Sequence, residues 1–449
     1  MSEWATVILA AGSGTRMKSD LPKVLHPVSG TAMIAHVVKT AQSVLNGQII
    51  VVVPPGADQI RQYLGNSVSY IEQTEPNGTG HALLQSEKAF GGKVSNLLVL
   101  YGDTPLLLAS TLSGLVERHQ TAGAAVTLLT SDQVPPDGLG RIVRDNSGQV
   151  VEIIEEANAD REHLSIPEVN GGVYGFHLDW IFPALRELTP STSGETYLTD
   201  VVKLATSSGQ VVTTASSMEA LEILGVNSRV QLAQAEKCMR ERVLNQWMLA
   251  GVTVIDPQNT YVDASVVIER DTVIHPNTSL FGDTHIGRSC ILGPGSMIYD
   301  SIIGENCMVV ASMLEEAKLE RRVNVGPFSH IRPGSVIERD VHIGNYAEIK
   351  NSRLGTGTRM GHFSYVGDAD VGSDVNIGAG VVTCNFDGKS KHETVIEDGA
   401  FIGSDTMLVA PVRVGARSVT AAGSVVTKDV PRDSLALGAP ARVRRKNTG

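Results

Sequence analysis

The feature that most constrains the fold is an aliphatic side chain that recurs every six residues through the C-terminal part of the chain. The series runs through Val262, Ile268, Ile274, Leu280, Ile286, Leu292 and Ile298, resumes after a slip at Val325, Ile331, Ile337, Ile343 and Ile349, continues with Leu354, Met360, Val366, Val371 and Ile377, and closes with Ile396, Ile402, Leu408, Val414, Thr420 and Val426. One inward side chain per face and a tight turn at each corner give triangular coils about 4.8 Å apart. The pattern therefore predicts a parallel β-helix.

Two breaks interrupt the period. The slip near residues 312–324 predicts an irregular coil. The stretch 383–394, which contains Cys384-Asn385-Phe386-Asp387-Gly388, predicts a loop that leaves the stack. Loops that leave a regular scaffold often build binding sites. Cys290 and Cys307 share one position in the repeat, close to one coil apart, and we interpret them as small buried side chains.

The N-terminal part has a different pattern, in which β-prone apolar runs alternate with amphipathic stretches up to about residue 226. Strands are predicted at 6–9, 49–53, 97–100, 124–129 and 169–176, and helices at 33–44 and 110–119. This alternation is typical of a mostly parallel sheet covered by helices, which binds ligands at the carboxyl ends of its strands.

A run of helix formers without glycine or proline separates the two parts and predicts a connecting helix over residues 228–250. The expected domains are therefore 1–227, the linker helix 228–250, and 251–449.

A phosphate-binding loop is predicted directly after the first strand. The segment Leu9-Ala10-Ala11-Gly12-Ser13-Gly14-Thr15-Arg16-Met17 is followed by Pro22-Lys23. Glycines let backbone N–H groups approach a polyphosphate, and Arg16 and Lys23 add positive charge there. Gly12-x-Gly14 alone also fits a plain turn, but the full motif favours nucleotide transfer.

Composition limits the other classes of function. The 449 residues carry a net charge of −11, which argues against general binding to nucleic acid or to an anionic membrane. The four cysteines form no CxxC pair and fit a reducing compartment. The apolar stretch at residues 7–11 lacks a basic flank, and no apolar run reaches membrane-spanning length. We therefore expect a cytoplasmic protein.

Over essentially its whole length the chain resembles the bacterial bifunctional N-acetylglucosamine-1-phosphate uridylyltransferases and glucosamine-1-phosphate acetyltransferases. The likeness rests on the loop at 9–17 with Pro22-Lys23-Val24-Leu25-His26, and on Gly78-Thr79-Gly80-His81-Ala82, Tyr101-Gly102-Asp103, Gly140-Arg141-Ile142, Gly225-Val226-Asn227, Gly361-His362 and Asn376-Ile377-Gly378-Ala379-Gly380. It implies an α/β Rossmann-like nucleotidyltransferase domain, a connecting helix and a left-handed parallel β-helix of hexapeptide repeats.

The resemblance also implies two reactions. The C-terminal domain would transfer acetyl from acetyl-CoA to glucosamine-1-phosphate. In the N-terminal domain, the phosphate of N-acetylglucosamine-1-phosphate would then attack UTP, and pyrophosphate would be released. The product, UDP-N-acetylglucosamine, would serve peptidoglycan and lipopolysaccharide synthesis.

In the front domain, Asp103 follows a strand and is a suitable anchor for Mg²⁺, although it also fits a capping aspartate. The resemblance assigns Asn227 to the same metal site, and this residue also fits an N-cap. It assigns Arg16 and Lys23 to catalysis. It further implies that UTP and the sugar contact Leu9, Ala10, Ala11, Gly12, Lys23, Gln73, Gly78, Thr79, Tyr101, Gly102, Asp103, Gly140, Glu155, Asn170 and Asn227, with Glu156 as an alternative to Glu155.

In the back domain, acetyl transfer needs a general base near neutral pH, and the resemblance assigns that role to His362. Glu348 would orient the histidine or bind the amine, or is a surface carboxylate. The sugar phosphate would contact Arg332, Glu348, Lys350, Tyr365 and Asn376, and acetyl-CoA would contact Ala379, Asn385, Phe386, Ser404, Ala422 and Arg442. The basic tail of Arg442, Arg444, Arg445 and Lys446 either binds the CoA phosphates or is a solvated end.

Relatives of this kind form homotrimers with acetyltransferase sites between subunits, so the resemblance implies a homotrimer. Two other interpretations stay open from the sequence. The β-helix could be only an oligomerisation or regulatory module, or the whole chain could be a non-catalytic sugar-nucleotide sensor.

Overall fold

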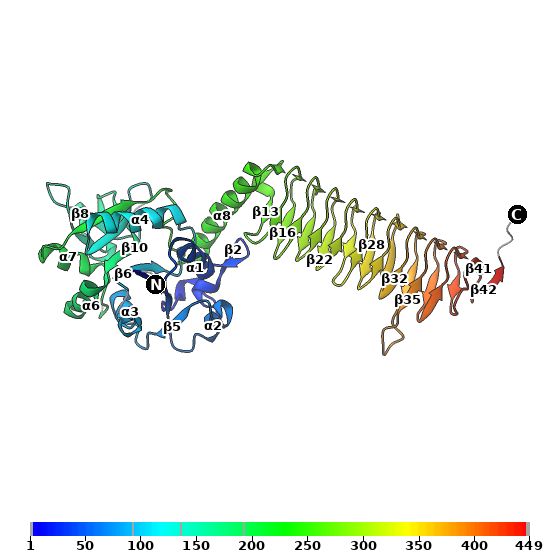
Figure 1. Cartoon of the computed structure of the whole chain (residues 1–449), viewed down its shortest axis with the longest axis horizontal. Coiled ribbons are helices and arrows are strands. Elements are labelled where there is room, and N and C mark those ends of the chain that lie inside the picture. The colour runs from blue at the N-terminus through cyan, green and yellow to red at the C-terminus, as the bar shows by residue number, and fades with distance from the viewer. Residues whose placement is uncertain (1–2, 92–93, 135–136, 192–193, 446–449) are drawn as a thin grey trace. The chain divides into compact units, whose positions relative to one another are not determined.

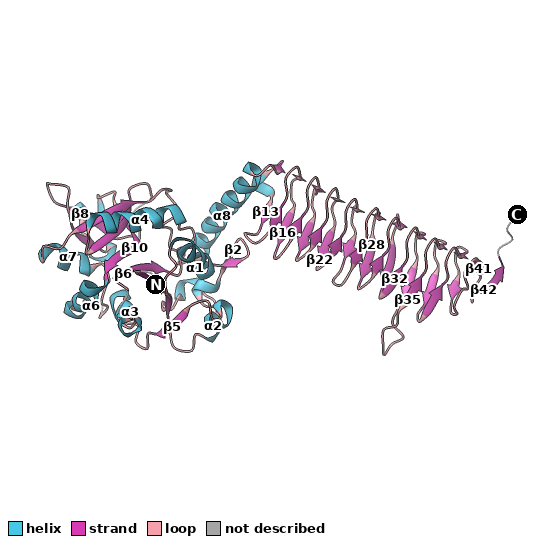
Figure 2. Cartoon of the chain, viewed as in Figure 1, coloured by secondary structure: helices cyan, strands magenta, loops and turns pink. Residues whose placement is uncertain are grey.

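The computed structural model describes residues 3–91, 94–134, 137–191 and 194–445. The chain divides into two compact units, residues 1–239 and 240–449. Helix α8 (Arg229–Leu249) runs across this division (Figure 1). Figure 2 shows that the first unit mixes helices with strands, whereas the stacked coils of the second unit consist of short strands and turns.

A nine-stranded mixed sheet forms the centre of the first unit, in the order β11-β7-β10-β6-β1-β4-β5, with β8 paired to β10 and β9 paired to β8. Its strands are β1 (Trp4–Leu9), β4 (Ile49–Val53), β5 (Ser69–Glu72), β6 (Asn96–Tyr101), β7 (Val126–Ser131), β8 (Arg141–Arg144), β9 (Val150–Ile154), β10 (Val169–His177) and β11 (Val212–Ser216). Strand β10 is antiparallel to both β6 and β7, whereas the β1–β4, β1–β6, β4–β5 and β7–β11 pairs are parallel.

Helices cover both faces of this sheet because its central strands are apolar on both sides. In β1, Trp4 and Ile8 pack in one core, and Ala5, Val7 and Leu9 pack in the other. The first core lies under α1 (Met33–Val44), α2 (Asp58–Leu64) and α4 (Ala109–Ala122), and the second lies under α3 (Thr79–Leu84), α6 (Leu178–Glu187) and α7 (Asp200–Ser207). The short pieces β2 (Pro27–Val28), β3 (Thr31–Ala32) and α5 (Arg161–Leu164) complete the unit.

The second unit is the expected β-helix, and its strands fall into three parallel stacks in which every third strand pairs. We call these stacks face one, face two and face three. Face one contains β12 (Thr253–Val254), β15 (Val273–Ile274), β18 (Ile291–Leu292), β21 (Met308–Val309), β24 (Asn324–Val325), β27 (His342–Ile343), β30 (Arg359–Met360), β33 (Asn376–Ile377), β36 (Phe401–Ile402), β39 (Val419–Thr420), β41 (Ser434–Leu437) and the antiparallel β42 (Arg442–Arg445).

Face two contains β13 (Tyr261–Val262), β16 (Ser279–Phe281), β19 (Met297–Tyr299), β22 (Met313–Glu315), β25 (His330–Ile331), β28 (Ala347–Lys350), β31 (Ser364–Gly367), β34 (Val382–Cys384), β37 (Met407–Val409) and β40 (Val425–Val426). Face three contains β14 (Val267–Ile268), β17 (His285–Ile286), β20 (Ile302–Ile303), β23 (Lys318–Leu319), β26 (Val336–Ile337), β29 (Arg353–Leu354), β32 (Ala369–Val371), β35 (Thr394–Ile396) and β38 (Val412–Val414).

The predicted irregular coil at 312–324 is wrong. The interior series continues through Ile303, Val309, Leu314 and Leu319, each at most 1% exposed. Strand β22 pairs in register with both β19 and β25, so the stack is unbroken there. The period slips because some corners are one residue shorter, and each short corner still turns through a left-handed residue, such as Asp300 (φ 44°).

The loop between β34 and β35 does leave the stack, as the sequence predicted, and Figure 1 shows it projecting beside β35. A bridge between Phe386 and Lys391 closes its neck.

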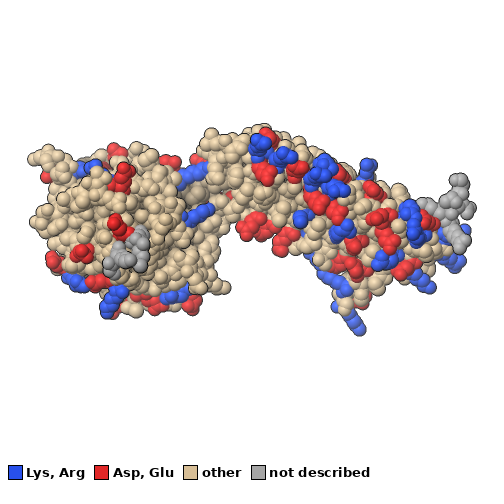
Figure 3. All heavy atoms as spheres, in the orientation of Figure 1, with Lys and Arg blue, Asp and Glu red and all other residues tan. Residues whose placement is uncertain are grey.

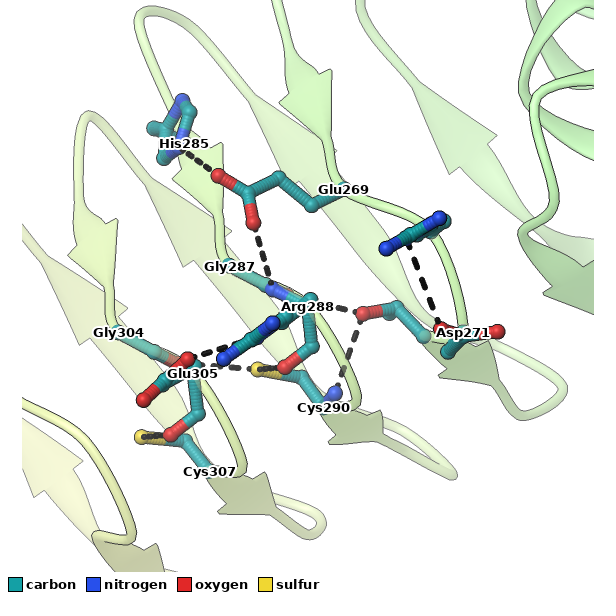
Figure 4. Close-up of polar contacts among 11 residues, drawn as sticks. Glu269, Asp271, His285, Gly287, Arg288, Cys290, Gly304, Glu305 and Cys307 are labelled. Carbon is teal, nitrogen blue, oxygen red and sulfur yellow. Dashed lines mark hydrogen bonds and ion pairs between the residues drawn. The ribbon is translucent and has the colours of Figure 1, made fainter.

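The two interior cysteines act as hydroxyl analogues (Figure 4). Two residues before each interior aliphatic residue, the chain carries a small buried side chain. At Thr272 this side chain donates to the Gly287 carbonyl at 2.9 Å. Cys290 donates in the same way to Gly304 O at 3.1 Å, and Cys307 donates to Glu320 O at 2.9 Å. Both thiols are at most 1% exposed, which confirms the interpretation as small buried side chains.

Charges of both signs are interspersed over the visible surface of the β-helix (Figure 3). Many pair between neighbouring coils, as Arg288 does with Glu305 at 2.7 Å and Arg322 with Asp340 at 2.6 Å. Such exposed pairs contribute little each, about 0–1 kcal/mol. Among the residues that the structure describes, no helix combines the length and apolarity needed to cross a bilayer.

Candidate active sites

A pocket of about 350 Å³ opens at the carboxyl ends of β1 and β6. Parallel β-sheets bind their ligands at this edge. Ten of the residues predicted for UTP and the sugar line it: Leu9, Ala10, Ala11, Gly12, Lys23, Gln73, Gly78, Thr79, Tyr101 and Asp103. The structure therefore brings the loop after β1, the segment before α3 and the end of β6 to one cavity.

Two glycines let these segments approach one another. Gly14 has φ of 61°, and a Cβ there would lie 2.7 Å from the Cβ of Lys23. Gly78 has φ of 96°, and a Cβ there would lie 2.5 Å from the Thr196 carbonyl oxygen. Only glycine fits such positions without moving the neighbouring backbone.

Lys23 and Asp103 line the pocket, and Asn227 meets them there through the Lys23 ammonium. The Lys23 ammonium forms an ion pair with Asp103 and donates to Asn227 Oδ1 at 3.0 Å. A backbone hydrogen bond from Val226 N to Asp103 O, 2.9 Å long, holds the two segments together. The carboxylate and amide oxygens thus face a single cation, and oxygens of this kind are what Mg²⁺ binds.

The first turn of α8 also anchors this corner. Arg229 donates to Met17 O and to His26 Nδ1, each at 3.3 Å. Burial, and then the positive charge of Arg229, lower the pKa of His26. The start of α8 is therefore hydrogen-bonded both to the loop that carries Arg16 and to the residue that follows the Lys23–Leu25 turn.

A second group of predicted residues surrounds Tyr101. Asn170 Nδ2 donates to the Tyr174 hydroxyl at 2.7 Å, and Thr199 donates to Glu155 Oε1 at 2.8 Å. Burial raises the pKa of Tyr101, and burial likewise raises the pKa of Glu155.

Glu155, rather than its neighbour, belongs to this group. A Cβ at Gly140 would lie 3.6 Å from Glu155 Oε2. The carboxylate of Glu156 instead accepts a hydrogen bond from Gly138 N.

Six of the predicted residues do not line the front pocket, namely Arg16, Gly102, Gly140, Glu155, Asn170 and Asn227. Arg16 is exposed on the short turn Thr15–Met17. Gly102 is buried under the pocket, where a Cβ would come within 3.3 Å of Ala10 and Val24. The pocket also has lining residues that were not predicted as ligand contacts: Ser13, Val24 and Ala82, which lie within the quoted motifs, and Pro76, Glu195 and Tyr197, which lie outside them. Glu195 and Tyr197 reach the pocket because hydrogen bonds hold their segment against the start of α3. Gly80 N donates to Thr196 O, and Leu198 N donates to Thr79 Oγ1. No local motif predicts these contacts.

The β-helix carries a second pocket, of about 730 Å³, on face one. His362, Asn376, Ala379, Ser404 and Ala422 line it, together with His342, Arg359 and Phe401, which the sequence did not mark. His362 is exposed at the corner between β30 and β31.

Apart from Arg442, which lies on face one, the other predicted acetyltransferase residues lie on face two or at its far edge. Arg332 pairs with Glu348 at 2.7 Å, and Glu348 is in register with Tyr365 on the next coil. Asn385 donates to the Tyr365 hydroxyl at 3.4 Å and also donates to the Asp368 carboxylate. One chain therefore presents the proposed sugar-phosphate and acetyl-CoA residues on two neighbouring faces that meet at the corner of His362.

Lys391, on the loop that leaves the stack, is a further residue at this edge that the sequence analysis missed. The neighbouring Lys350 ammonium lowers the pKa of Lys391. Phe386 on the same loop is 59% exposed, Arg442 is exposed on β42, and Lys446 of the basic tail lies outside the described residues.

Both parts of the chain match known protein families. Residues 6–167 match the MobA-like NTP transferase domain, and residues 393–428 match the bacterial transferase hexapeptide (six repeats). The chain is 47% identical to the bifunctional protein GlmU of Heliobacterium modesticaldum, over 97% of this chain and 96% of that one. It is 43% identical to the bifunctional protein GlmU of Shouchella clausii, over 100% and 99%, and 42% identical to that of Streptococcus agalactiae serotype V, over 99% and 97%.

The chain belongs to the bifunctional GlmU family. As a GlmU protein it is a bifunctional enzyme of UDP-N-acetylglucosamine synthesis, with a nucleotidyltransferase domain followed by a left-handed β-helix of the hexapeptide transferase type. This assignment decides against a β-helix that is only a scaffold and against a non-catalytic sensor.

Proposed function

We propose that the front pocket binds UTP and N-acetylglucosamine-1-phosphate together with Mg²⁺, and that Asp103 and Asn227 hold the metal. The observation that carries this proposal is the convergence of both side-chain oxygens on one cation at the Lys23 ammonium. A bound Mg²⁺ would neutralise charge on the triphosphate as the sugar phosphate attacks.

The chain's own residues would do the rest of the positioning. Gly12 and its neighbours after β1 would present N–H groups to the nucleotide, and Arg16 and Lys23 would neutralise the phosphates. Gly140, Glu155 and Asn170 would bind the sugar. Glu155 lies near Tyr101, Asn170 is linked to Tyr101 through Tyr174, and Gly140 lies beside Glu155.

In the back domain, we propose that acetyl-CoA lies along the pocket on face one and that His362 takes the proton from the amine of glucosamine-1-phosphate as the nitrogen attacks the thioester. The N–H of Ala379, which lines the same pocket, would donate to the oxyanion. Arg332, Lys350 and Lys391 would hold the sugar phosphate. The Lys350 ammonium lowers the pKa of Lys391, and a bound anion would offset this repulsion.

The division of these residues between two faces supports a site completed by a second chain, and we propose a homotrimer. The four cysteines are free thiols, which fits a reducing compartment, and we propose a cytoplasmic enzyme.

Two half-reactions measured separately test these roles. Wild type, His362→Ala and Asp103→Ala would be supplied with acetyl-CoA and glucosamine-1-phosphate while free CoA thiol is followed. The same three proteins would be supplied with UTP, Mg²⁺ and N-acetylglucosamine-1-phosphate while pyrophosphate is followed.

We expect His362→Ala to lose about 10²–10⁴-fold in the first reaction and Asp103→Ala to lose a comparable factor in the second. Each variant should retain the other reaction, which serves as its folding control. If His362→Ala keeps the acetyl transfer, the assignment of His362 is overturned. If Asp103→Ala keeps the uridylyl transfer, the assignment of Asp103 is overturned.

A further inference from the structure

The contact that joins Lys23 to Asp103 and Asn227 has a consequence for metal binding. Lys23 lies on the turn Lys23–Leu25, Asp103 follows β6, and Asn227 directly precedes α8. The side chains of Lys23 and Asp103 are only 12% and 17% exposed. Each of the two oxygen-bearing side chains is thus already paired with the Lys23 ammonium.

A divalent cation needs the same oxygens. Mg²⁺ binds oxygen at about 2.0–2.1 Å and takes the lone pairs to which the ammonium now donates. An ammonium and a divalent cation that share two oxygens would also repel each other at close range in a partly buried site. Lys23 and the metal therefore compete for these two ligands.

The surrounding backbone lets the ammonium move without refolding. The stem of Lys23 packs against the loop after β1, where a Cβ at Gly14 would come within 2.7 Å of the Lys23 Cβ. That loop is the proposed phosphate site. A lysine head on a flexible four-carbon stem can swing from Asp103 to this loop by rotation of its side chain alone.

We propose that Lys23 is an internal counter-ion of the metal ligands, which the divalent cation displaces, so that the released ammonium turns to the polyphosphate. This inference rests on the proposed metal site at Asp103 and Asn227. It predicts that removal of the ammonium strengthens metal binding, whereas a lysine that acts only on phosphate would leave metal binding unchanged.

The test measures Mn²⁺ affinity without nucleotide by the EPR signal of free Mn²⁺. The proteins are wild type, Lys23→Met, Lys18→Met and Asp103→Asn. Lys18 is a matched control because it is an exposed lysine beside the same loop. We expect Lys23→Met to bind Mn²⁺ at least tenfold more tightly than wild type and Lys18→Met to stay within twofold. Equal or weaker binding by Lys23→Met would overturn the proposal.

Asp103→Asn separates this proposal from the one on which it rests. We expect it to weaken Mn²⁺ binding at least tenfold. If it does so while Lys23→Met shows no gain, only the counter-ion fails; if Asp103→Asn has no effect, the metal site fails and the counter-ion with it.

A second measurement uses wild type alone and does not depend on how a variant folds. Lysines would be labelled with an amine-reactive acetylating reagent, with and without Mg²⁺, and the modification rates of Lys23 and Lys18 compared by mass spectrometry. Displacement by the metal should raise the rate at Lys23 several-fold relative to Lys18. A ratio that does not change with Mg²⁺ contradicts the displacement.

Discussion

The effect of the Lys350 ammonium on the pKa of Lys391 gives the proposed sugar-phosphate site a pH dependence. Lys350 lowers the pKa of Lys391, so Lys391 loses its charge at a lower pH than an ordinary lysine does. Binding of a phosphate needs the charged form.

We therefore expect the KM for glucosamine-1-phosphate to rise as the pH is raised through the depressed pKa of Lys391. In Lys350→Met that pKa returns toward its usual range, so the rise should move to higher pH even though the KM at neutral pH is larger. Steady-state KM values measured between pH 7 and 10.5 would show both effects. A rise at the same pH in both proteins would rule out coupling between the two lysines.

Individual site residues differ in how far the sequence could place them. The motifs around Gly12, Gly78 and Tyr101 each lie at the end of a strand or the start of a helix, and the structure brings residues of all three to one pocket. Lys391 and Tyr197 carry no such signal. They reach their sites through a loop and through backbone bonds to a distant segment.

At the level of single elements, the corners of the β-helix set how closely its coils can stack. Gly344 and Gly361 occupy equivalent corners on consecutive coils, yet their surroundings differ. A Cβ at Gly344 would lie 1.9 Å from the Gly361 carbonyl oxygen, whereas a Cβ at Gly361 would meet no atom within 4 Å.

We expect Gly344→Ala to destabilise the β-helix by about 2 kcal/mol or more, because the clash is with backbone that cannot move aside cheaply. Gly361→Ala is the matched control and should change the free energy of unfolding by less than about 1 kcal/mol. Urea unfolding followed by far-UV circular dichroism would compare the two. Similar losses in both variants would mean that the coil spacing adapts.

Element boundaries followed from the sequence where a strong period or breaker existed. The helix predicted at 33–44 coincides with α1, and every aliphatic residue of the hexad series lies in the interior. The short corners were misread as an irregular coil, because a one-residue deletion in a turn breaks the sequence period without breaking strand pairing. Strands β5, β8, β9 and β11 were not predicted, since they are short or only partly buried.

For the whole molecule, the proposed acetyltransferase site divides between two faces of one chain. His362 and Asn376 line the pocket on face one, whereas Lys350 and Tyr365 lie on face two. If a site combines face one of one chain with face two of another, two inactive variants should complement each other.

Lys350→Ala and Asn376→Ala, each with low acetyl transfer alone, would be unfolded together, refolded at equal amounts and assayed for CoA release. Random mixing should return about a quarter of the sites to the wild-type combination. The same variants refolded apart and then combined provide the control. No gain over that control would place both residues in a site made by one chain.

The sequence by itself determined the β-helix, the glycine-containing loop after β1 and the order of the two domains, because each is encoded by neighbouring residues with a fixed spacing. Only the tertiary structure decided which side chains meet. Asp103 and Asn227 reach the Lys23 ammonium across 80 and 204 residues of chain. Contacts over such separations depend on the order of strands in a sheet and on which face of a coil each residue occupies. A local sequence period does not predict them.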